Sequence, residues 1–231
     1  MAALNEADFA DPTSLLAAMG HSTRPEEQIW LDPSGRTSLA PRTGGMIQPV
    51  RYDIKEGSVL YRFGSQLGTP AQTMSGGWWI ERRELDQLIR FGEINDRTLG
   101  YAVRLLCCVP PEWGTALNLL VAVRTRGPLA AWRGLANSAW ASDRPGRTGS
   151  HSAALRGGFT RTDIEARNDI AAWRLHQLYI PGTRREGAAD RFFSLVAQWQ
   201  TEGRTRLALS AGIASPAGGQ GSIVAAAVRP V

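Results

Sequence analysis

Short apolar runs broken by glycine and proline recur along the chain from residue 47 onward. Runs of this length, bounded by turn residues, are typical of β-strands that are buried on one or both faces. The expected strands cover residues 47–52, 58–63, 78–81, 101–109, 117–124, 175–180, 206–212 and 222–229. The run at 101–109 is apolar enough for either a strand or a helix, and a strand is the first expectation.

Other segments place apolar residues at helical spacing. Asp11 and Pro12 suit the N-cap and first turn of a short amphipathic helix within residues 1–20, which Gly20 ends. A second helix is expected over residues 82–91, with Gly92 as its stop. Two more are expected over residues 163–173 and 188–201; the last would turn Phe192, Leu195, Val196 and Trp199 inward.

The mixture of strands and helices predicts an α+β domain. Residues 21–46 are rich in proline and glycine, so residues 1–46 are expected to form an N-terminal helix and linker arm. Residues 47–231 would form the globular domain, with a polar surface loop at 142–161.

Composition limits the classes of partner. The formal charge is +5, and arginines supply nearly all of the positive charge because Lys55 is the only lysine. Such a charge suits an anionic ligand or nucleic acid, although the arginines are scattered and form no dense basic block. No apolar run is long enough to span a bilayer, and no Sec signal peptide is visible, so no membrane association is expected.

The thiol and imidazole groups do not indicate a metal site. Cys107 and Cys108 are adjacent, and a disulfide between neighbours is strained, so a buried reduced pair is expected. The histidines at 21, 151 and 176 are too dispersed for zinc.

The densest candidate chemistry lies between residues 59 and 85. Arg62 and Phe63 should point to opposite faces of a strand, which leaves the guanidinium of Arg62 free to bind a phosphate or carboxylate. The glycines that follow allow sharp turns, and Trp78 and Trp79 offer flat faces for a base or pyridinium ring. A dinucleotide would suit such a site.

Three segments resemble the tuberculosis-necrotizing-toxin-like NAD glycohydrolases, which belong to the ADP-ribosyltransferase-like toxin folds. The first is Arg62-Phe-Gly-Ser-x-x-Gly-Thr69, followed by Ser75-Gly-Gly77 and Arg83-x-Leu85. The second is Gly127-Pro-Leu-Ala-Ala-Trp-Arg-Gly-Leu-Ala136, which is similar to a strand and turn of related toxins. The third is Gln177-Leu-Tyr-Ile-Pro181, which resembles the glutamine-bearing strand of the NAD cleft.

The resemblance implies a split β-sheet core with flanking helices and a site for NAD as substrate, with no resident cofactor. Arg62 would bind the diphosphate, Arg83 would reinforce it, and Gln177 would stand where transferring relatives keep a catalytic glutamate. The NAD site would also include Phe63, Gly64, Ser65, Trp78 and Trp132. His151 and His176 are the candidates for the family histidine, but His176 should face away from Gln177 on their strand.

The function implied is hydrolysis of NAD or NADP to nicotinamide and ADP-ribose (or its phosphate) by a bacterial toxin-type effector. Such a protein would be made in the bacterial cytoplasm, exported by a non-Sec route with a secretion adaptor, act in a target-cell cytoplasm and be held in check by a cognate immunity protein. Two alternatives stay open: a mono-ADP-ribosyltransferase acting on a protein or nucleic acid, and a non-catalytic arginine-rich module that binds nucleic acid or protein.

Overall fold

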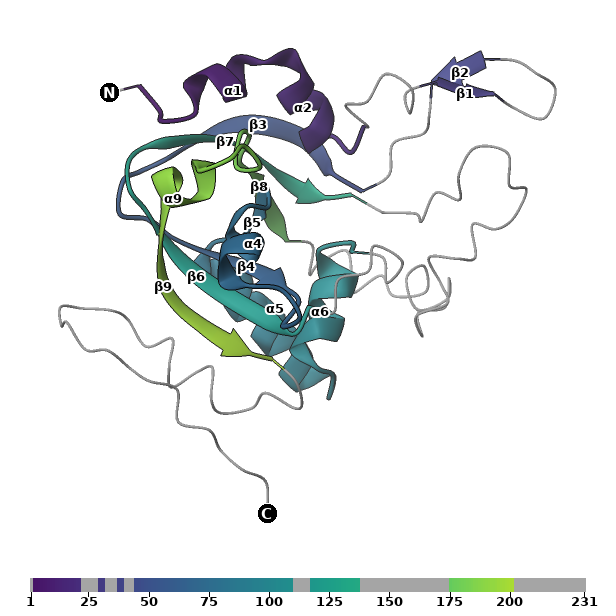
Figure 1. Cartoon of the computed structure of the whole chain (residues 1–231). Coiled ribbons are helices and arrows are strands. Elements are labelled where there is room, and N and C mark those ends of the chain that lie inside the picture. The colour runs from purple at the N-terminus through teal and green to yellow at the C-terminus, as the bar shows by residue number, and fades with distance from the viewer. Residues whose placement is uncertain are drawn as a thin grey trace.

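The computed structural model of the chain describes residues 2–21, 29–31, 37–39, 44–109, 117–137 and 175–201. Within these ranges the chain forms an α+β structure built on antiparallel sheets, as its pattern predicted (Figure 1). None of the helices in the described ranges is long and apolar enough to cross a bilayer.

Two antiparallel sheets form the body of the molecule. The first has four strands in the order β3 (Met46–Ile54), β7 (Leu129–Ala136), β8 (His176–Tyr179) and β5 (Trp78–Trp79). The second has three strands in the order β4 (Val59–Gly64), β6 (Leu119–Thr125) and β9 (Phe193–Gln200). A bridge between Tyr61 and Ile80 connects the two sheets. The short strands β1 (Ile29–Leu31) and β2 (Thr37–Leu39) pair separately with each other.

Apolar side chains from both sheets pack against one another. The core that they form includes Leu60, Val121 and Val123 from the three-stranded sheet, and Trp79, Leu129 and Leu178 from the four-stranded sheet. Each of these six side chains is at most 2% exposed. The burial of so much apolar surface fixes which face of β4 and β5 is turned toward the core.

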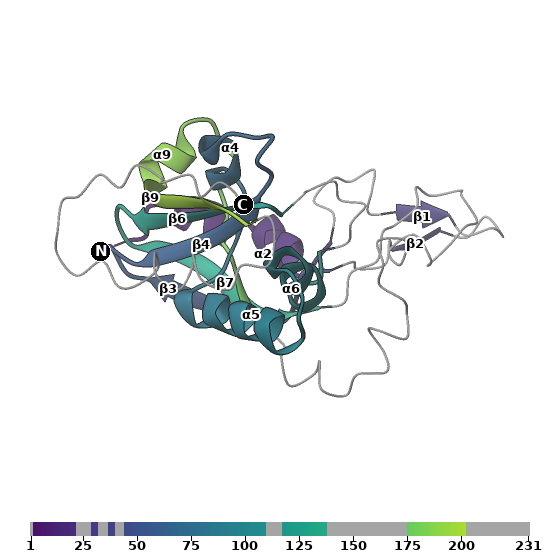
Figure 2. The ribbon, with the colours of Figure 1, turned by 90° about the horizontal axis from the view of Figure 1, so that it is seen from below.

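Helices α5 (Arg82–Ile94) and α6 (Leu99–Leu106) pack against each other and against the three-stranded sheet (Figure 2). Their contact with the sheet includes Tyr61 and Leu120, which alternate along their strands with the residues of the core between the sheets. Helix α4 (Pro70–Met74) begins with a capping box made by Thr69 and Gln72. Helix α9 (Ala188–Phe192) leads directly into β9.

The N-terminal residues form two helices, α1 (Glu6–Ala10) and α2 (Pro12–Ala18), instead of the single helix expected. Asp11 separates them and caps α2 through the backbone N–H of Thr13, as its place before Pro12 predicted. Both helices lie on the four-stranded sheet (Figure 1). The arm expected at 1–46 therefore begins with a segment that is packed on the domain.

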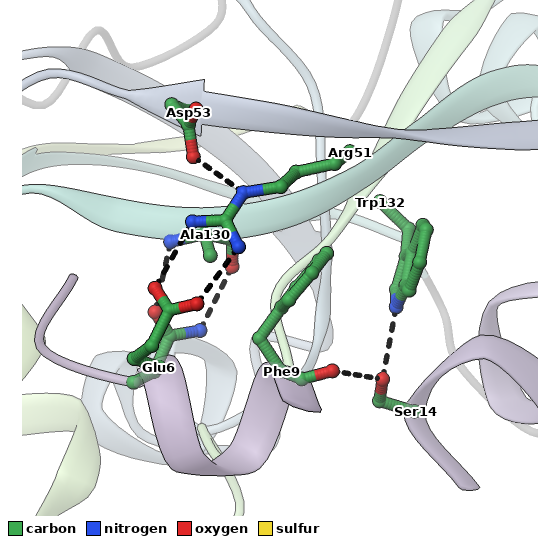
Figure 3. A network of polar contacts seen from close by, with 8 residues as sticks. Glu6, Phe9, Ser14, Arg51, Asp53, Ala130 and Trp132 are labelled. Carbon is green, nitrogen blue, oxygen red and sulfur yellow. Dashed lines mark hydrogen bonds and ion pairs between the residues drawn. The ribbon is translucent and has the colours of Figure 1, made fainter. Parts of the chain in front are cut away.

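Polar and aromatic contacts hold these helices to the sheet (Figure 3). Arg51 on β3 binds the Glu6 carboxylate through two hydrogen bonds of 2.7 and 3.0 Å. The buried side chain of Asn5 accepts a hydrogen bond from Ala130 N and donates one to Ala130 O, each 2.8 Å long. The ring of Phe9 stacks on Trp132 at 4.4 Å.

Two elements differ in type from the expectation. Residues 101–109 were expected as a strand, but Leu99–Leu106 form α6, because Leu99, Ala102, Val103 and Leu106 share one buried helical face. The helix expected at 188–201 is wrong beyond Phe192, since Phe193–Gln200 form β9 and pair with β6. Leu195 and Val196, expected to be buried, are 45% and 40% exposed on this strand.

The boundary of one helix also differs, because α5 continues past Gly92 to Ile94. A Cβ at Gly92 would lie 3.0 Å from the carbonyl oxygen of Arg97, so this glycine permits a close approach of the following turn. The remaining strands predicted between 47 and 180 are confirmed within one to two residues at most ends. The expected elements at 142–161, 163–173, 206–212 and 222–229 lie outside the described residues.

Candidate functional site

Arg62 lies near the end of β4, and its side chain points to the same side of the strand as the buried Leu60. Phe63 points to the opposite side and packs against the cluster that includes α5 and α6. The predicted division between the two residues is confirmed. Phe63 therefore anchors the strand from one face, whereas Arg62 occupies the face that is turned toward the core between the sheets.

The guanidinium of Arg62 is held in an unusual environment for a cation. Its Nη1 donates a 2.5 Å hydrogen bond to the carbonyl oxygen of Trp78, and its Cζ lies 6.0 Å from the centre of the Trp79 ring. Its Nε is buried and has no hydrogen-bond partner among the described residues. Burial, and to a smaller extent the positive charge of Arg184, lower the pKa of Arg62 to about 10.

The glycine turn before β5 makes room for this guanidinium. A Cβ atom on Gly76 would overlap Nη2 of Arg62, and a Cβ on Gly77 would lie 2.7 Å from Cε2 of Tyr179. Neither position tolerates a side chain without displacing one of these two residues. The glycines are therefore needed for the close approach of the backbone to Arg62 and Tyr179.

Gly64 and Ser65 join β4 to the segment that carries α4. A Cβ on Gly64 would overlap the hydroxyl of Thr73, which fits α4 tightly against the end of β4. The hydroxyl of Ser65 accepts a hydrogen bond from Leu67 N at 3.2 Å, and its carbonyl oxygen accepts one from Gly68 N at 3.0 Å. In the structure, both residues thus shape the turn beside Arg62.

Trp78 and Tyr179 place two rings next to the same turn. The residues are paired in register on β5 and β8, and their ring centres are 5.1 Å apart with a 51° angle between the planes. Burial raises the pKa of Tyr179, while the charge of Arg184 acts in the opposite direction. Arg184 is exposed, and its positive charge acts on both Tyr179 and Arg62.

The other predicted site residues are engaged elsewhere. The side-chain nitrogen of Gln177 donates a 2.8 Å hydrogen bond to the carbonyl oxygen of Cys107, at the end of α6. Trp132 stacks on Phe9, and its indole nitrogen donates to the hydroxyl of Ser14 at 3.0 Å (Figure 3). The described contacts therefore join Arg62 to Trp78, but they do not join it to Gln177 or Trp132.

Arg83 is exposed in the first turn of α5, and its positive charge acts on His176. His176 and Gln177 are neighbours on β8, so they face opposite sides of the sheet as predicted. Burial and the charge of Arg133 are the main causes that lower the pKa of His176. This shift favours the neutral form of the imidazole.

A polar cluster that sequence reasoning missed surrounds Arg133 on β7. Arg133 lies 3.6 Å from Glu84 and 3.9 Å from Glu81, and its Cζ is 5.3 Å from the centre of the Tyr52 ring. The Tyr52 hydroxyl donates to Oε1 of Glu81 at 2.9 Å. The cluster is close to His176, whose pKa responds to Arg133, Glu84 and Glu81. We call Arg133, Glu84, Glu81 and Tyr52 the Arg133 cluster.

Four buried side-chain atoms lack a hydrogen-bond partner within the described part of the chain: Arg62 Nε, Trp79 Nε1, Arg133 Nε and Glu84 Oε2. Trp79 and Arg133 both lie opposite Leu178 in the sheet register, so their side chains share one face. Arg62 is directed toward Trp79 from the adjoining strand. Three of these four atoms are N–H donors, which are buried without a partner among the described residues.

No signal in the sequence pointed to the Arg133 cluster. Arg133 stands in an otherwise apolar run, and the spacing of Glu81 and Glu84 is common on solvated helices. Sheet register brings Arg133 to these carboxylates, and register cannot be read from one strand alone.

The cysteines are free, but both are half-buried, whereas a buried pair was expected. Burial raises the pKa of the Cys107 thiol, which lowers its reactivity at neutral pH. Within the described ranges, no group of three or more acidic, histidine or cysteine side chains could hold a metal ion.

The chain was compared with protein-family models, curated proteins and solved structures. No protein-family model matches the chain, and the search of curated proteins found no match. Among solved structures, the chain is similar to Rhs1-CT in complex with its cognate immunity protein RhsI1, with 15% sequence identity and a TM-score of 0.37. The match covers 67% of this chain and 83% of that chain.

Proposed function

We propose that this chain hydrolyses NAD or NADP to nicotinamide and ADP-ribose or its phosphate, and that it acts as a bacterial toxin-type effector. The proposal rests on one observation: a largely desolvated arginine, Arg62, that has a single carbonyl partner in the described structure. A desolvated cation without a counter-ion is costly, and an anionic ligand removes most of that cost.

A diphosphate fits the surroundings of Arg62. The guanidinium can offer its free N–H groups as a fork to two phosphate oxygens. Arg184 adds a second positive charge that now repels Arg62 and would attract the same anion. Trp78 and Tyr179 lie beside the two cations and offer ring surfaces for the base or pyridinium of a dinucleotide.

The proposed reaction breaks the bond between the ribose C1′ and the pyridinium nitrogen of NAD. The bonding electron pair moves to that nitrogen and neutralises its positive charge, so nicotinamide leaves as a neutral molecule. The oxygen of water forms the new bond to C1′, and one proton is released. Because the leaving group is already activated, the protein mainly has to orient the dinucleotide and stabilise developing charge.

Arg62 would fix the diphosphate and thereby place C1′ in reach of water. A role of Gln177 in holding the ribose stays a prediction, since its amide nitrogen is bonded to Cys107 O. Delivery to a target cell and inhibition by a cognate immunity protein belong to the same proposal, because NAD hydrolysis would harm the cell that makes the enzyme.

The test is incubation of the purified chain with NAD, followed by chromatography of the products. Equal amounts of nicotinamide and ADP-ribose are expected. Nicotinamide without free ADP-ribose would instead show transfer or cyclisation, and label from NAD in macromolecules would identify the transferase. Intact NAD in the presence of a folded protein would refute the proposal.

A further inference from the structure

The loop at 181–187 joins β8 to α9 and carries two successive arginines, Arg184 and Arg185. The backbone N–H of Arg185 donates to the carbonyl oxygen of Gly182 at 3.1 Å, which closes a turn with Arg184 inside it. The positive charge of Arg184 acts on Arg62. The placement of this loop therefore decides where the second cation of the proposed diphosphate site lies.

Helix α1 contacts this loop from a distant part of the chain. Nδ2 of Asn5, at the start of α1, donates to the carbonyl oxygen of Pro181 at 3.2 Å. Gly182 has a φ of +83°, and a Cβ atom on it would overlap the carboxylate of Asp8, so only glycine lets the loop pass this close to the helix. Nη2 of Arg185 lies 2.6 Å from Oδ1 of Asp8. The loop is thus held against α1 at Pro181, Gly182 and Arg185.

The ion pair between Asp8 and Arg185 is buried at one end only. The side chain of Asp8 is 7% exposed, whereas that of Arg185 is 67% exposed. A buried carboxylate is costly to leave without a partner, so Asp8 draws the guanidinium of Arg185 toward α1. Arg185 is engaged there, and Arg184 is the arginine of the turn whose charge acts on Arg62.

We infer that Asp8 is a positioning residue for the anion site: its ion pair with Arg185 holds the loop so that Arg184 binds the same diphosphate as Arg62. The inference rests on the proposed function, since it takes the diphosphate of NAD as the ligand. Asp8 acts through the loop and makes no contact with the ligand. Helix α1 is then a part of the NAD site and not a separate arm.

The experiment measures the Kd of pyrophosphate for the purified full chain by calorimetry at low ionic strength, where charges are least screened. Asp8→Asn keeps the shape of the side chain and breaks the ion pair, but it also makes the chain more positive. The added charge alone would tighten the binding of an anion, whereas release of the loop should weaken it at least about threefold, as expected for an exposed charge. Glu6→Gln changes the charge of α1 equally and breaks the ion pair with Arg51, yet it should not weaken binding.

Arg185→Gln breaks the same ion pair from its exposed end, so it decides the matter even if Asp8→Asn fails to fold. It should weaken pyrophosphate binding at least about threefold more than Arg191→Gln, which removes an exposed arginine of α9 and the same charge. In an Arg184→Gln background, Asp8→Asn should cause no further loss, because Asp8 acts through Arg184. With NAD as substrate, Asp8→Asn should raise KM and leave kcat nearly unchanged.

The inference would be overturned by unchanged or tighter binding in a folded Asp8→Asn variant, by equal losses in Asp8→Asn and Glu6→Gln, or by equal losses in Arg185→Gln and Arg191→Gln. An absence of pyrophosphate binding by wild type would also overturn it. NAD hydrolysis by a chain that gives any of these results would refute the inference alone. The expected order of pyrophosphate affinities in a chain that leaves NAD intact would refute the proposed hydrolysis alone.

Discussion

Replacement of Arg62 by methionine should not destabilise the free protein, although Arg62 is largely desolvated. A fall in the pKa of Arg62 from 12.5 to about 10 corresponds to about 3 kcal/mol of unfavourable free energy for the charged form. Its hydrogen bond to Trp78 O returns about 1.5–3 kcal/mol. Methionine fills a similar volume without a charge, so Arg62→Met should change the free energy of unfolding by between zero and about 2 kcal/mol in the stabilising direction.

Urea denaturation followed by circular dichroism measures this change, with Arg90→Met on the exposed side of α5 as the matched control. The control should lie within about 0.5 kcal/mol of wild type. In the presence of pyrophosphate, the unfolding midpoint of wild type should rise, while that of Arg62→Met should not. A loss of 2 kcal/mol or more in Arg62→Met without ligand would show that Arg62 is a structural residue, and the reasoning would fail.

Three further predictions concern other parts of the structure. Gly76→Ala places a Cβ against the guanidinium of Arg62, so NAD hydrolysis should fall at least tenfold in a product assay. In the control Gly100→Ala, the new Cβ meets only Leu117 O at 3.5 Å, so this variant should retain activity. Equal activities of the two variants would contradict the close packing of Gly76 against Arg62. Asn5→Ala leaves the buried backbone N–H and C=O of Ala130 unpaired. The free energy of unfolding, measured by urea denaturation, should therefore fall by about 3 kcal/mol. A change under about 1 kcal/mol would show that the contact of α1 with β7 is not needed for stability. Folding lowers the pKa of His176 below 6.5, so the folded protein binds fewer protons than the unfolded chain. The free energy of unfolding should therefore fall as the pH drops below about 6.5. His176→Asn should make the free energy of unfolding less dependent on pH in this range.

The sequence was sufficient for the parts of the fold that depend on local patterns. The strand carrying Arg62 and Phe63, the cap at Asp11 and the buried run at Leu119–Thr125 follow from alternation, capping and length. Periodicity failed where it was ambiguous. A continuous apolar run hid the helical face of α6, and helical spacing at Phe192–Trp199 was overridden by pairing with β6.

The candidate site was predictable only in part for the same reason. Arg62, Trp78 and the glycines lie close together in the chain, so their proximity could be expected. The contact of Gln177 with Cys107 and the contacts of Arg133 with the carboxylates depend on how distant segments are placed. Trp132 looked available for a ligand, but its partner Phe9 comes from more than a hundred residues earlier in the chain.

NAD turnover by wild type and Arg62→Met, measured as kcat/KM from the release of nicotinamide, tests most directly whether Arg62 acts on a dinucleotide. Arg90→Met serves again as the control, and circular dichroism confirms that each variant is folded. Wild type and the control should hydrolyse NAD equally well, and Arg62→Met should lose about a hundredfold or more in kcat/KM because a charged hydrogen bond in an enclosed site is missing. Equal kcat/KM values in all three proteins, or no turnover by folded wild type, would contradict the role proposed for Arg62.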